Sequence, residues 1–182
     1  MSRLAHQQII STTKRWISDF VIKLSLCPFA HVGFEADSIH YAVSDNWQHR
    51  SMLEDVWSAG QRLVADDTVS DCFVIFPARV TFSYLLQLQS IYNSLLQETS
   101  TDEYVQTVVF HPEFLFEGEE HHHAGNYVNR SPHPMIHLLR VSLVAEATAT
   151  LPDELSIPLA NQKKLAVMGS DELAMQLQNY DL

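Results

Sequence analysis

Residues 71–77, Asp-Cys-Phe-Val-Ile-Phe-Pro, decide the fold class of this chain. Five consecutive apolar residues stand between an aspartate and a proline, a pattern typical of a short strand that is covered on both faces. Pro77 ends the run because it has no backbone N–H to donate to a neighbouring strand. We expect residues 72–76 to form the central strand of a sheet.

Strands and helices alternate on both sides of this segment. Residues 39–43 alternate between apolar and polar side chains as a short strand does, and residues 104–110 form a third strand candidate. Apolar residues recur at helical spacing over about 5–25, 52–65 and 81–96. Strands that alternate with helices of this length are typical of parallel pairing through right-handed crossovers. We therefore predict an α/β fold, with one layered domain over residues 1–182 and a small, mainly parallel sheet of about three strands covered by several helices.

The second half of the chain begins with a long polar loop, which we place at residues 112–131. Ser131 is a preferred residue before a helix and Pro132 fits its first turn, so we expect a helix from there to about residue 150. Two shorter helical segments are predicted at residues 163–168 and from residue 170 onward.

Composition excludes several classes of partner. The chain has 22 acidic and 11 basic residues and a formal charge of −11, which argues against nucleic acid and against anionic membrane surfaces. No apolar run approaches the roughly 20 residues that span a bilayer, so we expect no membrane association. Two cysteines cannot form a disulfide framework, and the first residues lack the apolar core of a signal peptide, so we expect a cytoplasmic protein.

A candidate anion site lies in the predicted helix after Ser131. Arg130 and Arg140 are the only basic residues between positions 80 and 162. On a helix, Arg140 would lie in the apolar arc, three residues after His137, and its side chain would reach toward the first turn, whose N–H groups attract an anion. Together with Asn129, these residues predict a site for a phosphate- or carboxylate-bearing molecule. The alternative is internal pairing of both arginines with acidic residues of the 112–131 loop, since structural ion pairs resemble binding sites.

Histidines supply candidates for proton transfer. Six of the ten histidines lie between residues 111 and 137. His111 follows a predicted strand and His137 lies near Arg140, and imidazole can accept or donate a proton near neutral pH. A histidine at the end of a strand is also often a hydrogen-bonding structural residue.

Metal and thiol chemistry are the weaker alternatives. His121, His122 and His123 lie among glutamates, which suits Zn²⁺, but adjacent side chains do not easily face one ion and no metal-binding spacing accompanies them. We predict no metal, with zinc at these histidines as the alternative, and the sequence has no nucleotide-cofactor motif. Cys27 is a possible nucleophile. Because it closes a predicted helix, where the dipole would raise the pKa of its thiol, we expect a buried, small apolar residue instead, as we do for Cys72.

Three motifs resemble one family of bacterial proteins. They are Leu-Cys-Pro-Phe-Ala at residues 26–30, Phe-His-Pro at 110–112, and Asn-Tyr-Val-Asn-Arg-Ser-Pro continuing to His-Leu-Leu-Arg at 126–140. The order and length of most of the chain resemble the family called domain of unknown function 1415, and the resemblance implies no particular activity. It implies that the family's motif positions are occupied here by Cys27, His111, Asn129, Arg130, Ser131, His137 and Arg140.

Three functional hypotheses follow. The first is an enzyme or binding protein for a small anionic metabolite, with Arg130, Arg140 and Ser131 holding the anion and His111 or His137 moving a proton. The second is a non-catalytic interaction or assembly module, which includes a homo-oligomer, in which the same residues order the 112–131 loop. The third is a pH-sensitive element, because protonation of ten histidines would change the charge from −11 to −1.

Overall fold

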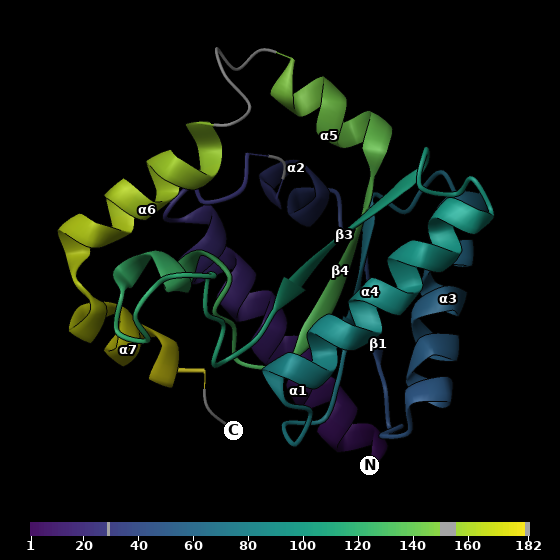
Figure 1. Cartoon of the computed structure of the whole chain (residues 1–182), viewed down its shortest axis with the longest axis horizontal. Helices are drawn as coiled ribbons and strands as arrows, with labels where there is room; N and C mark the ends of the chain where they lie inside the picture. The colour runs from purple at the N-terminus through teal and green to yellow at the C-terminus, as the bar shows by residue number, and fades with distance from the viewer. Residues whose placement is uncertain (29, 150–155, 181–182) are drawn as a thin grey trace.

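The structure, a computed structural model, describes residues 1–28, 30–149 and 156–180. Its centre is a sheet of four strands in the order β1-β2-β4-β3 (Figure 1). The strands are β1 (Ile39–Val43), β2 (Asp71–Ile75), β3 (Val105–Phe110) and β4 (Met135–Arg140). β1 and β2 pair in parallel, whereas β4 runs antiparallel to both β2 and β3. The predicted α/β class is confirmed, but the prediction of about three mainly parallel strands is wrong: the sheet is mixed and has four.

The fourth strand comes from the segment for which the sequence predicts a helix. Residues 131–150 form no single helix; β4 is followed directly by the short helix α5 (Val141–Thr148), and the predicted end at residue 150 lies outside the described residues. The strand reads Met-Ile-His-Leu-Leu-Arg and is buried along nearly its whole length between β2 and β3. A short segment that is apolar all round fits a buried strand as well as a buried helix, so periodicity alone cannot separate the two.

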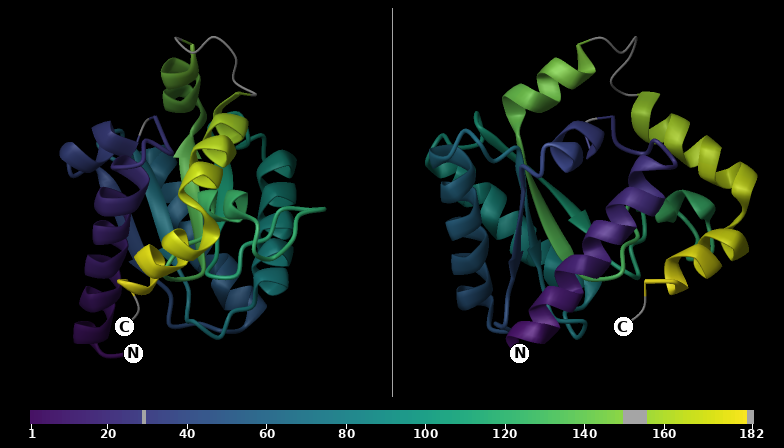
Figure 2. Two further views of the ribbon diagram at one scale, coloured as in Figure 1. Left: turned by 90° about the vertical axis from the view of Figure 1, so that its left-hand side faces the viewer. Right: turned by 180° about the vertical axis from the view of Figure 1, so that it is seen from behind.

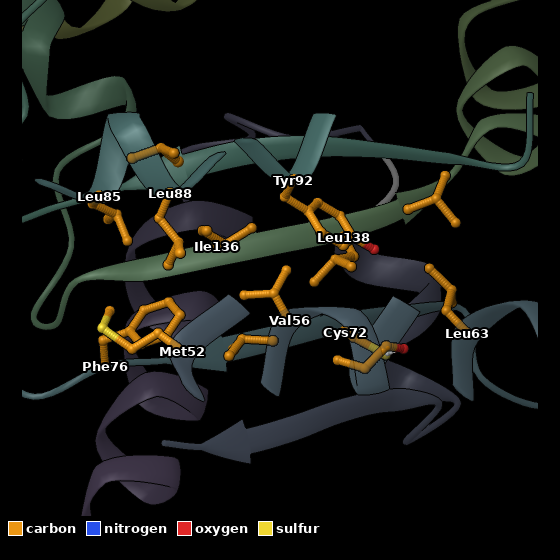
Figure 3. Packing of buried hydrophobic residues seen from close by; sticks show 14 of the residues in the cluster. Met52, Val56, Leu63, Cys72, Phe76, Leu85, Leu88, Tyr92, Ile136 and Leu138 are labelled. Carbon is orange, nitrogen blue, oxygen red and sulfur yellow. Dashed lines mark hydrogen bonds between the residues drawn. The ribbon is translucent and has the colours of Figure 1, made fainter. Parts of the chain in front are cut away.

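Helices α3 (His49–Ala65) and α4 (Phe82–Glu98) cover one face of the sheet. Their apolar stripes pack on the strands in a continuous core (Figure 3). Met52, Val56 and Leu63 come from α3, and Leu85 and Leu88 come from α4. Both predicted helices are confirmed within a few residues at each end.

The other face is covered by segments from the two ends of the chain and by one short helix of the loop between β3 and β4 (Figure 2). They are α1 (Arg3–Trp16), the π-helical turn η1 (Ile17–Ile22), α2 (Ala30–Glu35), the 3-10 helix η2 (Ala124–Val128), α6 (Ser156–Met168) and α7 (Ser170–Gln178). α1 begins where the Ser2 hydroxyl accepts a hydrogen bond from the Ala5 N–H. The predicted helix over residues 5–25 is therefore correct for α1, but its last part is a π-helix, a form frequent at functional sites. No helix in the described ranges is long and apolar enough to span a bilayer.

Candidate functional site

A cavity of about 340 Å³ lies on this second face of the sheet. Its wall is formed by residues of α1, η1, α2 and α5 together with residues of all four strands. Most of the lining side chains are apolar, and the largest are Trp16, Phe73 and Phe110. The polar and titratable lining residues are Cys27, Ser38, Ser70, Asp71, His137, Arg140 and Glu146.

A buried pair of titratable residues forms the polar part of this wall. Asp71 begins β2 and His137 lies in the middle of β4, and the register places Asp71 opposite Leu139, two residues from His137. This diagonal brings Nε2 of His137 to 2.7 Å from Oδ1 of Asp71. The two side chains are 10% and 12% exposed. A carboxylate only accepts hydrogen bonds, so Nε2 carries the proton and Nδ1 of a neutral His137 is a bare acceptor.

The imidazole of His137 is held in one orientation. Its ring stacks on Phe73 with the centroids 3.9 Å apart and the planes 8° from parallel, and Phe110 lies against it at a tilt. Nδ1 makes no hydrogen bond to any residue that the structure describes. His137 therefore presents one unused proton acceptor at the cavity wall.

A chain of hydroxyl groups supports Asp71 from behind. Ser70 donates its hydroxyl to Oδ2 of Asp71 at 2.7 Å, and Ser38 donates to Ser70 at 2.9 Å. Helix α2 approaches so closely that a Cβ on Gly33 would lie 2.8 Å from the Ser70 oxygen and 3.1 Å from Oδ2 of Asp71. Both carboxylate oxygens are thus satisfied, and a glycine is needed at position 33.

Cys27 lines the same cavity as His137. The residue does not close a helix as predicted, because η1 ends at Ile22 and Ser25 turns the chain with a positive φ of 49°. It is half-buried and packs against the apolar cluster of this face, so the prediction of a buried, small apolar residue is confirmed only in part for Cys27. The prediction is confirmed for Cys72, which is 0% exposed in β2.

Arg140 contributes to the rim of the cavity but is largely engaged elsewhere. Its Nε donates to the Val69 carbonyl at 2.9 Å and an Nη donates to the Asp66 carbonyl at 2.6 Å. It thereby fixes the turn that precedes β2. The predicted arrangement of Arg140 beside His137 on one helix is wrong, because both residues belong to a strand.

The remaining predicted anion ligands hold the loop between β3 and β4, and none of them lines the cavity. Arg130 is 5% exposed and donates to the carbonyls of Phe114 and His121, while its guanidinium lies over the Tyr127 ring. Asn129 donates to the Val109 carbonyl. The helix N-terminus that the prediction assigned to the anion is absent, since residues after Ser131 lead into β4 and no helix begins there.

The Ser131 hydroxyl donates to the carbonyl of His133 instead. Asn126, which the sequence analysis does not single out, is 0% exposed and joins three backbone groups of the same loop. The loop from residue 112 to 131 is therefore tied down by its own polar side chains.

His111 also belongs to this loop rather than to the cavity. Its Nε2–H donates to the Val80 carbonyl at 2.9 Å, and its Nδ1 accepts the Glu113 N–H at 2.9 Å. Both ring nitrogens are thus used by backbone groups, which requires the neutral imidazole. Burial lowers the pKa of His111, against the smaller opposing effect of the Val80 hydrogen bond.

The lowered pKa of His111 predicts a loss of stability in mild acid. The unfolded chain binds a proton near pH 6.5 whereas the folded His111 resists it, so stability falls as the pH drops below about 6.5. Burial lowers the pKa of His40 as well, so the wild-type slope contains both residues. We expect urea unfolding of His111→Gln between pH 7.5 and 5.5 to show a shallower decline than the wild type. A His122→Gln variant, altered at an exposed position, should keep the wild-type slope, and an unchanged slope in His111→Gln would contradict the prediction.

The three adjacent histidines do not come together around one point. His121 and His122 contact each other edge to face, whereas His123 lies 3.2 Å from a carboxylate oxygen of Glu119. Across the described ranges, no three His, Cys, Asp or Glu side chains are grouped so that they could hold a metal ion. The zinc alternative therefore gains no geometric support.

The acidic and hydroxyl members of the site could not be identified from the sequence. Asp71, Ser70 and Ser38 come from segments that precede His137 by more than 60 residues. One signal is present in the sequence: an aspartate at the start of a strand that is otherwise wholly apolar requires a buried partner. The identity of that partner depends on β4, which periodicity does not reveal.

Comparison with protein families gives one match. The sequence model of the family described as Protein of unknown function (DUF1415) matches residues 8–175. This range contains every residue that lines the cavity. No curated protein and no solved structure matches the chain.

Proposed function

The chain belongs to the DUF1415 family, and we propose that this protein is an enzyme that acts on a small, mainly apolar molecule bound in the cavity, with His137 as its proton-transfer group. The observation that carries the proposal is the 2.7 Å hydrogen bond between His137 and Asp71 in the wall of that cavity.

The chemistry of the pair favours proton transfer over a purely structural role. A structural histidine usually satisfies both ring nitrogens, as His111 does with two backbone groups. His137 uses only Nε2, and the acceptor Nδ1 lies within a cavity wall. When Nδ1 takes a proton from a ligand, the resulting imidazolium is stabilised by the Asp71 carboxylate. The mainly apolar lining lowers the local dielectric constant and strengthens this interaction.

The lining also defines the kind of ligand. Trp16, Phe73 and Phe110 offer an apolar surface, and a pocket of this size accepts a small organic molecule. Among the residues that the structure describes, Arg140 is the one arginine at the wall, and its hydrogen bonds to the Val69 and Asp66 carbonyls reduce its capacity to bind an anion. His137 therefore remains the proton-transfer group, as in the hypothesis of an anionic ligand. The ligand itself is mainly apolar and has a single polar group.

A ligand screen by thermal shift tests the proposal. Hexanamide, methyl hexanoate and inorganic phosphate are added separately to the wild-type protein. A ligand at 100 times its dissociation constant stabilises by about 2.7 kcal/mol, which raises Tm by roughly 5–10 °C at this chain length. We expect the hexanoyl compounds to raise Tm and phosphate to leave it unchanged. ¹⁵N spectra of the histidines should show His137 as the Nε2–H tautomer, with an Nδ1 signal that moves when the ligand is added.

A matched pair of variants locates the ligand. Val32 and Leu4 are both 71% exposed, but only Val32 lines the cavity. Val32→Trp should reduce the Tm shift at least severalfold, because the larger side chain obstructs the cavity, whereas Leu4→Trp should leave it unchanged. The proposal fails if neither hexanoyl compound raises Tm, or if Val32→Trp has no effect on the shift.

A second candidate function is a protein-interaction module built on the 112–131 loop. The supporting observation is that Arg130, Asn126 and Asn129 use their side chains to hold that loop. This candidate predicts no ligand shift in the screen and a concentration-dependent mass in analytical ultracentrifugation if the partner is a second copy.

A further inference from the structure

We infer that Cys27 is the nucleophile of this cavity and that its substrate is a small ester or thioester with an apolar acyl group. The inference rests on the proposed function, because it uses His137 as the base. It adds a covalent step and a substrate class.

Cys27 shares this wall with an independent feature, the unused ring nitrogen of His137. Cys27 is half-buried and lines the cavity. His137 lines it as well, its side chain is nine-tenths buried, and its Nδ1 has no hydrogen-bond partner in the part of the chain that the structure describes. The wall thus holds the three parts of a catalytic triad. The cysteine is the nucleophile, the histidine with its unused nitrogen is the base, and the aspartate that binds the other nitrogen orients the histidine.

The second cysteine shows what an inert thiol looks like in this protein. Cys72 is 0% exposed, and its thiol donates to the Ala59 carbonyl. Burial raises the pKa of Cys72 to about 12. Cys72 faces the α3–α4 core, away from the cavity, and so provides an internal control.

The substrate class follows from the groups at the wall. One histidine that first accepts and then donates a proton suits acyl transfer, in which a leaving alcohol or thiol must be protonated. The apolar side chains of Ile17, Val21 and Leu143 fit the acyl chain. Besides Cys27 and His137, the titratable or charged groups at the wall are Asp71, Arg140 and Glu146.

The reaction has two balanced halves. The Sγ–H proton passes to Nδ1 of His137, sulfur bonds to the carbonyl carbon, and the bond to the leaving alcohol or thiol breaks as that group takes the proton from Nδ1. Water then attacks the Cys27 thioester and gives a proton to Nδ1. The carbon–sulfur bond breaks, the carboxylic acid leaves, and the proton returns to Sγ.

Alkylation by iodoacetamide tests the nucleophile separately from ligand binding. Modification of Cys27 is followed by peptide mass spectrometry at pH 6.5 and pH 9 in the wild type, His137→Gln and Asp71→Asn. An ordinary cysteine is only about 1% thiolate at pH 6.5, whereas it is mostly ionised at pH 9. We expect the Cys27 rate to fall about tenfold at pH 6.5 in His137→Gln and to differ less than twofold at pH 9. Asp71→Asn should lower the rate at pH 6.5 in the same direction.

Controls make each outcome decisive. Cys72 should stay unmodified in every variant that folds, so its alkylation would identify an unfolded variant. If His137→Gln is unfolded by this criterion, the comparison of Asp71→Asn with the wild type decides. His122→Gln should react at the wild-type rate. Equal Cys27 rates at pH 6.5 in the wild type and in the folded variants would overturn the nucleophile, even if the ligand screen succeeds.

A second probe tests the substrate class. p-Nitrophenyl butyrate should transfer its acyl group to Cys27 in the wild-type protein and not in Cys27→Ala, as measured by intact mass and by release of p-nitrophenol. A reactive Cys27 that forms no acyl adduct would overturn the ester class.

Discussion

Replacement of Arg130 by alanine is expected to lower the free energy of unfolding by about 3 kcal/mol, because two charge-assisted hydrogen bonds are lost and the Phe114 carbonyl loses its side-chain donor, while the His121 carbonyl keeps its hydrogen bond from Asn126. The Arg130 guanidinium donates to the Phe114 carbonyl at 3.2 Å and to the His121 carbonyl at 2.7 Å. It also stacks 4.5 Å from the centre of the Tyr127 ring. Urea unfolding at pH 7.5 measures the loss, and limited proteolysis should show earlier cleavage within residues 112–131.

Arg50 provides the control for this experiment. It is exposed and, within the described ranges, pairs with Glu54 alone, four residues along the same helix, so Arg50→Ala should change stability by less than about 0.5 kcal/mol. Arg130→Ala should also keep the ligand-induced Tm shift, because Arg130 does not line the cavity. Unchanged stability together with a lost ligand response would instead support an anion-binding role for Arg130.

Replacement of Gly60 by alanine should destabilise the protein by about 2 kcal/mol, the cost of overpacking a close-fitting core. Gly60 lies inside α3, where alanine would ordinarily stabilise a helix by about 1 kcal/mol. Here a Cβ would collide with the hydroxyl of Tyr92, which is 0% exposed beneath α3. A lower free energy of unfolding would therefore indicate the collision, whereas a higher one would indicate that helix propensity dominates.

A double-mutant cycle identifies the colliding atom. Tyr92→Phe removes the hydroxyl and leaves the ring carbon that bore it 3.4 Å from the new Cβ, an ordinary contact. In the Tyr92→Phe background, Gly60→Ala should therefore be neutral or stabilising in urea unfolding. A destabilisation of the same size in both backgrounds would show that another contact is responsible.

The extent to which the fold could be predicted depended on how many faces of each element are buried. Helices α3 and α4 expose one side to water, so their apolar stripes carry a clear period, and both were located from the sequence. β2 was found because Pro77 and Asp71 delimit its apolar run. β4 could not be predicted, because it lies between β2 and β3 and is buried on both faces. Residues 135–139 therefore lack the alternation of polar and apolar side chains that identifies a strand with one exposed face.

The site was predictable only where its residues share one segment. His137 and Arg140 were singled out because few basic residues and a recognisable motif surround them. Asp71 could not be joined to His137 without the antiparallel register of β2 and β4. The expected effect of a helix dipole on Cys27 requires a helix that ends at this residue, whereas η1 ends at Ile22, several residues earlier.

The position of β4 imposes an order of assembly while the chain is being synthesised. β1 and β2 can pair once residue 75 has emerged from the ribosome. β2 and β3 do not pair with each other, because β4 lies between them and is the last strand to be synthesised. Residue 71 of β2, for example, pairs with residue 139 of β4. Until then, two edges with unpaired backbone groups remain available to other chains, and such edges promote association. The strand that carries His137 thus also joins β3 to the β1–β2 pair. A nascent chain that stalls near residue 130 lacks this strand and should be prone to aggregate.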